Sequence, residues 1–144
     1  MSLRAYRVCR RIHAALDGVG ASQVGGRWNS PGRAVVYMAE SVSLAVLENL
    51  VHLSPVDFPV GYISITVSIP DSVKILTEAD RRRTVRRSTL GDRWIDSLDS
   101  GVLKVPSGVV PSEHNYLLNP LHPDFSQITV VETLPFVFDP RLFA

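Results

Sequence analysis

Residues 25–52 read GGRWNSPGRAVVYMAESVSLAVLENLVH, which predicts a glycine-rich loop, a short buried strand and an apolar helix in succession. The strand ends near Tyr37 and Met38. Apolar side chains at 100° per residue cover most of the helix circumference, which indicates that the helix is buried. They are Val42, Leu44, Val46, Leu47, Leu50, Val51 and Leu53. A narrow polar stripe remains, made of Ser41, Glu48, Asn49 and His52.

Two interpretations of this polar stripe are open. From periodicity alone, Glu48 is a charge that faces solvent. The second interpretation is a polar cavity, because Gly25 and Gly26 let the backbone approach a ligand closely and place Arg27 just upstream of the strand. Arginine is suited to planar, bidentate recognition of phosphate. Loop, strand and helix therefore each supply one polar group to a possible site.

Composition predicts one ordinary globular domain spanning residues 1–144. The formal net charge of +1 does not indicate direct binding to nucleic acid. A single cysteine, Cys9, excludes an internal disulfide and fits a reducing compartment. The N-terminus lacks the apolar region of a signal peptide, and no apolar run is long enough to span a bilayer. We therefore expect a cytoplasmic protein that does not bind membranes.

The rest of the chain predicts further strands and loops. Residues 62–69 alternate strictly between apolar and polar side chains, which is typical of a half-buried strand. Residues 102–110 form two extended pieces that meet at a kink centred on Ser107, whose hydroxyl is interpreted as bonding its own backbone. Residues 115–123 contain two prolines and two asparagines and predict an irregular loop. Residues 127–134 are the final predicted strand, and the arginine-rich segment 81–87 predicts a solvated helix face.

Three familiar classes of site are poorly supported. The glycines before Arg27 are not followed directly by a helix, as a dinucleotide-binding fingerprint requires. Neither Ser107 nor Ser112 lies in a Gly-x-Ser-x-Gly elbow, which argues against a serine hydrolase. The four histidines lack metal-ligand spacing, so we expect no metal site. The remaining set, Arg27, Tyr37, Glu48 and Ser107, suits a phosphorylated ligand and a positive charge developing at a sugar carbon.

Several motifs occur together in a fixed order. They are Gly25-Gly26-Arg27-Trp28-Asn29, then Val36 to Ser41 leading into Leu47-Glu48, then Val105-Pro106-Ser107, then Asn115 to Pro120 with His122-Pro123. In these motifs the sequence resembles the RES-domain toxins of bacterial toxin–antitoxin pairs, named for an Arg, a Glu and a Ser. The resemblance implies an α+β fold related to ADP-ribosyltransferases, with mostly antiparallel sheets and flanking helices. It also implies that NAD+ is the substrate, cleaved at its nicotinamide–ribose bond, and that no prosthetic group is needed.

The resemblance also implies a role for individual residues. Arg27 would hold the NAD+ phosphates and Tyr37 would line the nicotinamide pocket. Glu48 would stabilise the ribosyl cation, and Ser107 would complete the pocket. Arg7 and Asn119 are weaker candidates around it.

The implied partner is an Xre-type antitoxin with a helix-turn-helix domain, with a larger toxin–antitoxin assembly as an extension. The acceptor of the ADP-ribosyl group stays open among water, phosphate and a protein. A catalytically silent module that binds a nucleotide or an antitoxin is the alternative hypothesis.

Overall fold

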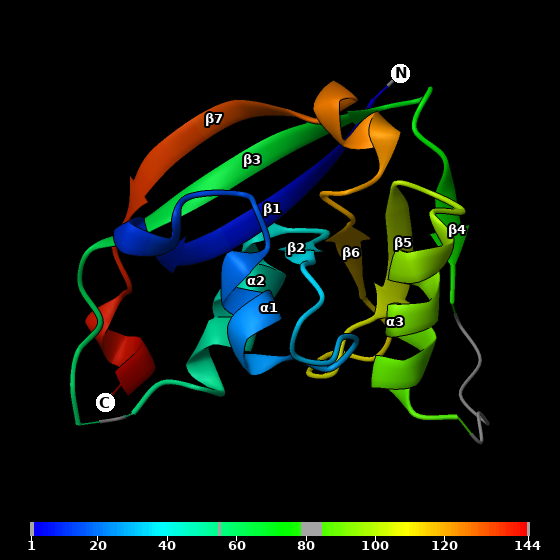
Figure 1. The fold of residues 1–144 in the computed structure, drawn as a ribbon. Coiled ribbons are helices and arrows are strands. Elements are labelled where there is room, and N and C mark those ends of the chain that lie inside the picture. The colour runs from blue at the N-terminus through cyan, green and yellow to red at the C-terminus, as the bar shows by residue number, and fades with distance from the viewer. Residues whose placement is uncertain (1, 55, 79–84, 144) are drawn as a thin grey trace.

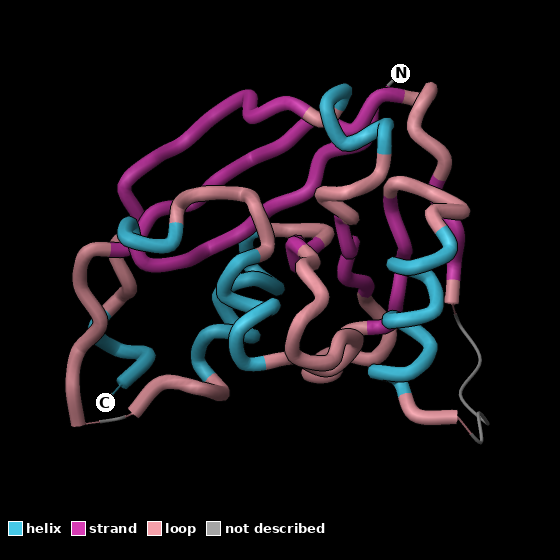
Figure 2. Tube along the Cα trace, in the orientation of Figure 1, coloured by secondary structure: helices cyan, strands magenta, loops and turns pink. Residues whose placement is uncertain are grey.

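The computed structural model describes residues 2–54, 56–78 and 85–143. Figure 1 shows a curved sheet with helices packed against it, and Figure 2 marks the same elements by type. The strands are β1 (Ser2–Arg10), β2 (Val36–Ala39), β3 (Tyr62–Pro70), β4 (Ile75–Thr77), β5 (Val102–Pro106), β6 (His114–Leu118) and β7 (Thr129–Phe136). The helices are α1 (Val19–Val24), α2 (Val42–Leu50) and α3 (Arg87–Ser97), with short 3₁₀ turns η1 (Arg11–His13), η2 (Pro123–Gln127) and η3 (Pro140–Phe143). The predicted α+β class is confirmed.

The seven strands form one sheet in the order β4-β5-β6-β2-β1-β3-β7, antiparallel except for the β4–β5 pair. Strands β1 and β3 pair along their whole length, whereas β1 and β2 share a single register pair, Tyr6 with Ala39. The sheet therefore divides into two halves that separate beyond this pair. In Figure 1, β7, β3 and β1 run together on one side, and β2, β6, β5 and β4 stand on the other.

Alternation along the strands separates the apolar core into two faces. On β6, Tyr116 and Leu118 join the cluster under β1 and β3, while Leu117 joins a second cluster with Trp28 and Trp94. A third cluster lies on the same face as the second and packs Leu44 and Ala45 of α2 against β1 and β3. The alternation predicted for residues 62–69 is confirmed, because the odd-numbered apolar positions are buried. The second face therefore carries helices over both halves of the sheet.

Helix α2 is not buried all round, so that part of the prediction is wrong. Only Leu44 and Ala45 are fully buried, while Leu47 and Val51 are 43% and 58% exposed. Ser41 caps the helix by accepting a hydrogen bond from the Leu44 amide at 3.1 Å. One face of α2 packs on the sheet and the opposite apolar face lies at the surface.

The polar stripe of α2 has structural as well as exposed members. Asn49 donates to the Val8 carbonyl at 2.8 Å, beyond the single point where β1 pairs with β2. The Asn49 amide thereby provides a donor for the Val8 carbonyl, which has no hydrogen-bond donor on β2. His52, after the end of the helix, is exposed.

The predicted loop at residues 115–123 is wrong at its start, because 114–118 form the central strand β6. This strand pairs with β2 on one side and β5 on the other, and Tyr116, Leu117 and Leu118 are buried. Local turn chemistry suggested a loop, but burial of three consecutive side chains between two neighbouring strands outweighs it.

Two smaller differences concern the element boundaries. A short helix, α1, forms directly before the predicted glycine-rich loop, between Gly18 and Gly25, which both have positive φ. The last strand covers 129–136 rather than 127–134. Most of the arginine-rich segment 81–87 lies outside the described residues, and its last residue, Arg87, begins α3. No helix in the described ranges is long and apolar enough to cross a bilayer.

Candidate active site

The Glu48 carboxylate is held by side chains from two other parts of the chain. Its Oε2 accepts a hydrogen bond from the Ser107 hydroxyl at 2.9 Å, and its Oε1 accepts one from Asn115 Nδ2 at 2.9 Å. Glu48 comes from α2, Ser107 follows β5, and Asn115 lies on β6. The fold therefore brings together residues separated by 59 and 67 positions in sequence. Each carboxylate oxygen has one fixed donor.

Ser107 bonds both to its own turn and to Glu48. Its oxygen accepts hydrogen bonds from the amides of Val109 at 3.1 Å and Val110 at 3.2 Å, so it is the turn hydroxyl that the sequence suggests. A hydroxyl has two acceptor lone pairs and one hydrogen. With two amides directed at the oxygen, the hydrogen points to Glu48. The kink after β5 therefore aims a donor, while the side chain itself is only 2% exposed.

Arg27 lies against the same turn. A Cβ atom added at Gly108 would lie 2.8 Å from a terminal nitrogen of the Arg27 guanidinium. The guanidinium thus covers the residue directly after Ser107, and the absence of a side chain at Gly108 makes this approach possible. Arg27 is exposed, so its charge is accessible from solvent beside the Glu48 cluster.

Tyr37 and Asn29 hold the loop that carries Arg27. The Tyr37 hydroxyl donates to Asn29 Oδ1 at 2.6 Å and accepts from the Trp28 amide at 3.1 Å. Asn29 is 1% exposed and donates to the carbonyls of Ala21 at 2.8 Å and Arg33 at 2.9 Å. Trp28 is buried. The phenol of Tyr37 therefore fixes the backbone on which Arg27 stands.

Burial raises the pKa of Tyr37 from 10.0 to about 12, against a smaller lowering by the Trp28 amide, and the Asp92 charge adds to the rise. In the unfolded chain the phenol loses its proton near 10.0, whereas the folded protein keeps it to about 12. Between these values the unfolded state binds fewer protons, so the free energy of unfolding falls as pH rises. We expect Tyr37→Phe to reduce that alkaline loss by up to about 2 to 3 kcal/mol.

Urea unfolding of wild type and Tyr37→Phe, measured below and within this pH window, tests the expectation. The pKa of Tyr116 is also raised by burial, but that residue is present in both proteins and cancels in the comparison. Parallel declines in stability with pH would contradict the assignment.

Arg7 bridges the two halves of the sheet. From β1, its Nη1 donates to the Tyr37 carbonyl on β2 at 3.3 Å, across the region where the two strands have separated. Its Nε is buried and has no hydrogen-bond partner among the described residues. A buried N–H without an acceptor costs free energy, so Arg7 carries an unsatisfied donor at this contact. Arg7 thereby joins Tyr37 at the separation of the sheet halves.

A model of the RES domain matches residues 4–139 of this sequence. The chain belongs to the RES domain family. "Toxin Res" of Yersinia enterocolitica is 40% identical over 148 residues, covering 95% of this chain and 97% of that protein. "Prs ADP-ribosylating toxin" of Sphingobium sp. is 37% identical over 138 residues, covering 88% of this chain and 86% of that protein.

A chain in the crystal structure of the M. tuberculosis MbcT-MbcA toxin-antitoxin complex superposes on this RES domain with a TM-score of 0.69. The comparison covers 99% of this chain and 87% of that chain at 19% identity, so it shows a shared fold. The family predicted from the sequence motifs is confirmed.

The RES domain does not bring Asn119 to the Glu48 cluster. Asn119 is fully buried beyond the opposite end of β6, where it donates to the Ile95 carbonyl at 3.0 Å and accepts from the Leu121 amide at 3.1 Å. Asn115, four residues earlier, is the asparagine that contacts Glu48. Sequence reasoning missed it because the segment was interpreted as a loop. Gly108 was missed because the sequence does not show that Arg27 lies beside it.

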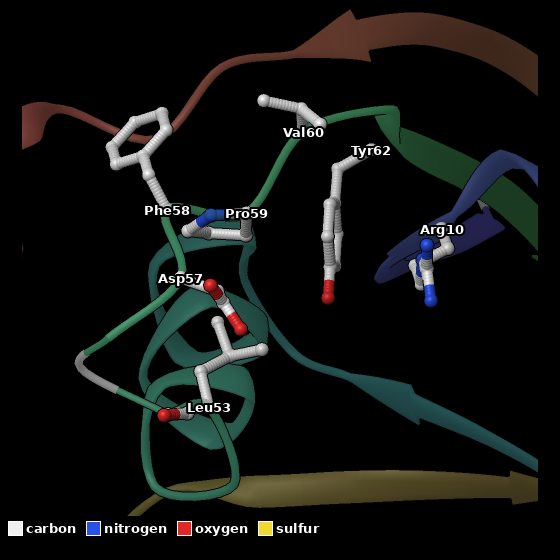
Figure 3. A pocket seen from close by; sticks show the side chains of 8 residues that line it. Arg10, Leu53, Asp57, Phe58, Pro59, Val60 and Tyr62 are labelled. Carbon is white, nitrogen blue, oxygen red and sulfur yellow. The ribbon is translucent and has the colours of Figure 1, made fainter.

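Two hollows in the described surface lie away from this cluster. One, of about 280 Å³, is lined by Arg10, Leu53, Ser54, Asp57, Phe58, Pro59, Val60 and Tyr62. Figure 3 shows Asp57 on the loop that leads into β3, Tyr62 at the start of β3, and Arg10 on β1, around the open space. The other, of about 330 Å³, lies between β4 and α3. The candidate site of this RES domain is therefore defined by its polar contacts rather than by either hollow.

No group of three or more metal-binding side chains occurs in the part of the chain that the structure describes. The site thus consists of Glu48 with two donors, Arg27 on the adjoining turn, and the Tyr37–Arg7 contact beside it. Such a set can bind an anionic ligand and present a carboxylate to a centre of positive charge.

Proposed function

We propose that this RES domain is the toxin of a toxin–antitoxin pair and that it consumes NAD+ by cleaving the nicotinamide–ribose bond. The observation that carries the proposal is the Glu48 carboxylate, fixed by Ser107 and Asn115 beside the exposed Arg27. Relatives at 40% and 37% identity are named Toxin Res and Prs ADP-ribosylating toxin, which supports the same class of activity.

The proposed reaction needs little covalent chemistry from the protein. Nicotinamide leaves as a neutral base with the electron pair of the broken bond, and the ribose C1′ becomes electron-deficient. A nearby carboxylate stabilises such an oxocarbenium-like centre, as in glycosidases. Water or a protein nucleophile then forms the new bond to C1′ and releases its proton to solvent, whereas phosphate forms that bond with an oxygen that is already anionic. Glu48 supplies the negative charge throughout.

The two arginines divide the binding of the substrate anion. Arg27 is exposed on the glycine-rich loop and would contact the pyrophosphate with its planar guanidinium. Arg7, which donates through Nη1 to the Tyr37 carbonyl, would contribute a second positive charge at the separation of the sheet halves. The Tyr37 ring would line the nicotinamide pocket while its hydroxyl holds the Arg27 loop.

We expect Arg27→Lys to weaken NAD+ binding about tenfold, because an ammonium keeps the charge but loses the bidentate hydrogen bonds. Calorimetry measures this directly when both proteins also carry Glu48→Gln, which is expected to prevent NAD+ cleavage during the titration. Arg141→Lys is the matched control, since Arg141 is an exposed residue whose guanidinium pairs with Asp139 at 2.7 Å. Equal NAD+ affinities for wild type and Arg27→Lys would remove Arg27 from the site.

The proposed activity implies an inhibitory protein partner. An enzyme that destroys NAD+ in its own cell requires an inhibitor, and we propose an Xre-type antitoxin with a helix-turn-helix domain that closes the Glu48 site within a toxin–antitoxin assembly. The structural relative comes from a toxin–antitoxin complex, which supports an antitoxin partner of some kind. Attraction between the arginines of this RES domain and an acidic antitoxin surface would speed the association of the two proteins.

Expression in bacteria tests the proposal as a whole. The chain alone should arrest growth and deplete NAD+, and co-expression of the antitoxin encoded beside it should prevent both. The purified complex should neither bind nor cleave NAD+. If the isolated chain is harmless at high expression and leaves NAD+ intact, the alternative of a silent nucleotide- or antitoxin-binding module is favoured. Products formed with and without inorganic phosphate identify the acceptor.

A further inference from the structure

We infer that Asn115 is a positioning residue that fixes the Glu48 carboxylate for the reaction. The inference rests on the proposed NAD+-cleaving function. It concerns a residue on β6 outside the arginine, glutamate and serine positions for which the family is named. Asn115 is half-buried, and its amide contacts the Glu48 carboxylate.

The Asn115 amide is oriented by two acceptors. Its Nδ2 donates to Glu48 Oε1 at 2.9 Å and to the Met38 carbonyl at 3.2 Å. A carboxamide nitrogen has two hydrogens, and both are used here. The reversed amide would place its oxygen against a carboxylate and a carbonyl, which repel it. The Met38 contact therefore selects the orientation in which Asn115 is a donor to Glu48.

Asn115 also stands on one of the most firmly held strands. It pairs with Ala39 of β2 and with Val105 of β5, so β6 is central in its half of the sheet. At the start of β6, the His114 amide donates to the Glu40 carboxylate at 2.5 Å, and the Glu40 amide donates to the His114 carbonyl at 3.1 Å. A catalytic group is held most precisely when its support is a regular element rather than a loop.

Glu48 needs such support because α2 is held on one face only. The side chain has three rotatable bonds, and Ser107 alone would leave Oε1 able to turn about the Oε2 contact. A second donor on the other oxygen fixes the plane of the carboxylate. Misplacement of a catalytic group by about 1 Å costs up to about 100-fold in rate. Loss of Asn115 should therefore lower kcat more than it weakens binding.

Asn115→Asp is the sharpest test, because it keeps the size and replaces the donor by a second carboxylate. We expect kcat to fall about 10- to 100-fold at neutral pH with KM little changed, and to recover in acid, where a protonated Asp side chain can donate to Glu48. Other charged groups nearby are Arg27, Arg7, Glu40, His114 and His52. They are common to both proteins, so the readout is the pH dependence of the ratio of variant to wild-type kcat.

Asn119, just after the end of β6, gives a matched control. Asn119→Asp changes a fully buried asparagine that bonds to Ile95 and Leu121 instead of Glu48. We expect it to lower the melting temperature and to leave the kcat of the folded protein, and its pH profile, unchanged. Asn115→Ala removes the donor without adding a charge, so its kcat loss should not recover in acid.

Crystal structures of wild type and Asn115→Ala provide a readout independent of NAD+ turnover. We expect the Glu48 carboxylate in one orientation in wild type and in several in the variant. Wild type that cleaves no NAD+ but shows this difference would overturn the proposed function and keep the positioning role. A single unchanged Glu48 orientation in Asn115→Ala, or an Asn115→Asp variant with wild-type kcat at every pH, would overturn the inference.

Discussion

Glu48→Gln should reduce the release of nicotinamide from NAD+ by on the order of 100 to 1000-fold, the usual cost of one preorganised electrostatic contact in a transition state. The substitution keeps the shape of the side chain and removes only its charge. A glutamine oxygen can still accept from Asn115, while its nitrogen meets the Ser107 oxygen, so we expect a stability loss of about 1 kcal/mol. Activity and folding are thereby separated.

The assay compares initial rates of the purified proteins at saturating NAD+, with circular dichroism as the check on folding. Glu132→Gln is the matched control, since Glu132 lies on the exposed strand β7 and should be dispensable. Growth arrest in cells should disappear with Glu48→Gln and persist with Glu132→Gln. A folded Glu48→Gln variant with near-wild-type turnover would refute the role of the carboxylate.

Gly91→Ala should give the largest loss of stability, about 3 kcal/mol, which corresponds to a fall in melting temperature of about 10 °C. Gly91 is buried in α3, and a Cβ atom there would lie 1.6 Å from the Trp28 carbonyl oxygen and 2.6 Å from its carbon. Both atoms are backbone, so the helix and the Arg27 loop must separate. Activity should fall as well, because Trp28 is next to Arg27.

Gly20→Ala supplies the control for this prediction. Gly20 lies in α1, and a Cβ atom there meets nothing within 4 Å, so the change should be neutral or slightly stabilising. Thermal unfolding of the three proteins by calorimetry gives the comparison. Equal melting temperatures for wild type and Gly91→Ala would show that α3 does not pack on Trp28 as described.

Local patterns predicted the elements whose side chains alternate cleanly. Residues 62–69 form a strand because every second side chain is apolar. Ser41, predicted only as part of the polar stripe, is the residue that caps the first turn of α2. The same logic failed at β6, where asparagines normally mark turns but neighbouring strands impose an extended backbone. It also failed for the outer face of α2, since periodicity cannot tell which apolar side chains find a neighbour.

The candidate site was only partly visible in the sequence. Arg27, Glu48 and Ser107 were identified through the family resemblance, and the structure brings the three close together. Asn115 and Gly108 were missed, because their importance depends on contacts across 67 residues and on a missing side chain. Asn119 was predicted near the site on the same motif, yet β6 places it at the far end. The types of side chain suggested which chemistry the site could perform. The pairing of strands distant in sequence determined which of these side chains lie beside Glu48.

Nicotinamide release from NAD+ by the purified chain tests the central claim most directly. The protein is incubated with NAD+ alone and with NAD+ plus phosphate, and the free base is quantified by chromatography over time. We expect release in repeated turnovers by wild type and almost none by Glu48→Gln at equal concentration. NAD+ that stays intact with folded, antitoxin-free wild type under both conditions would contradict it.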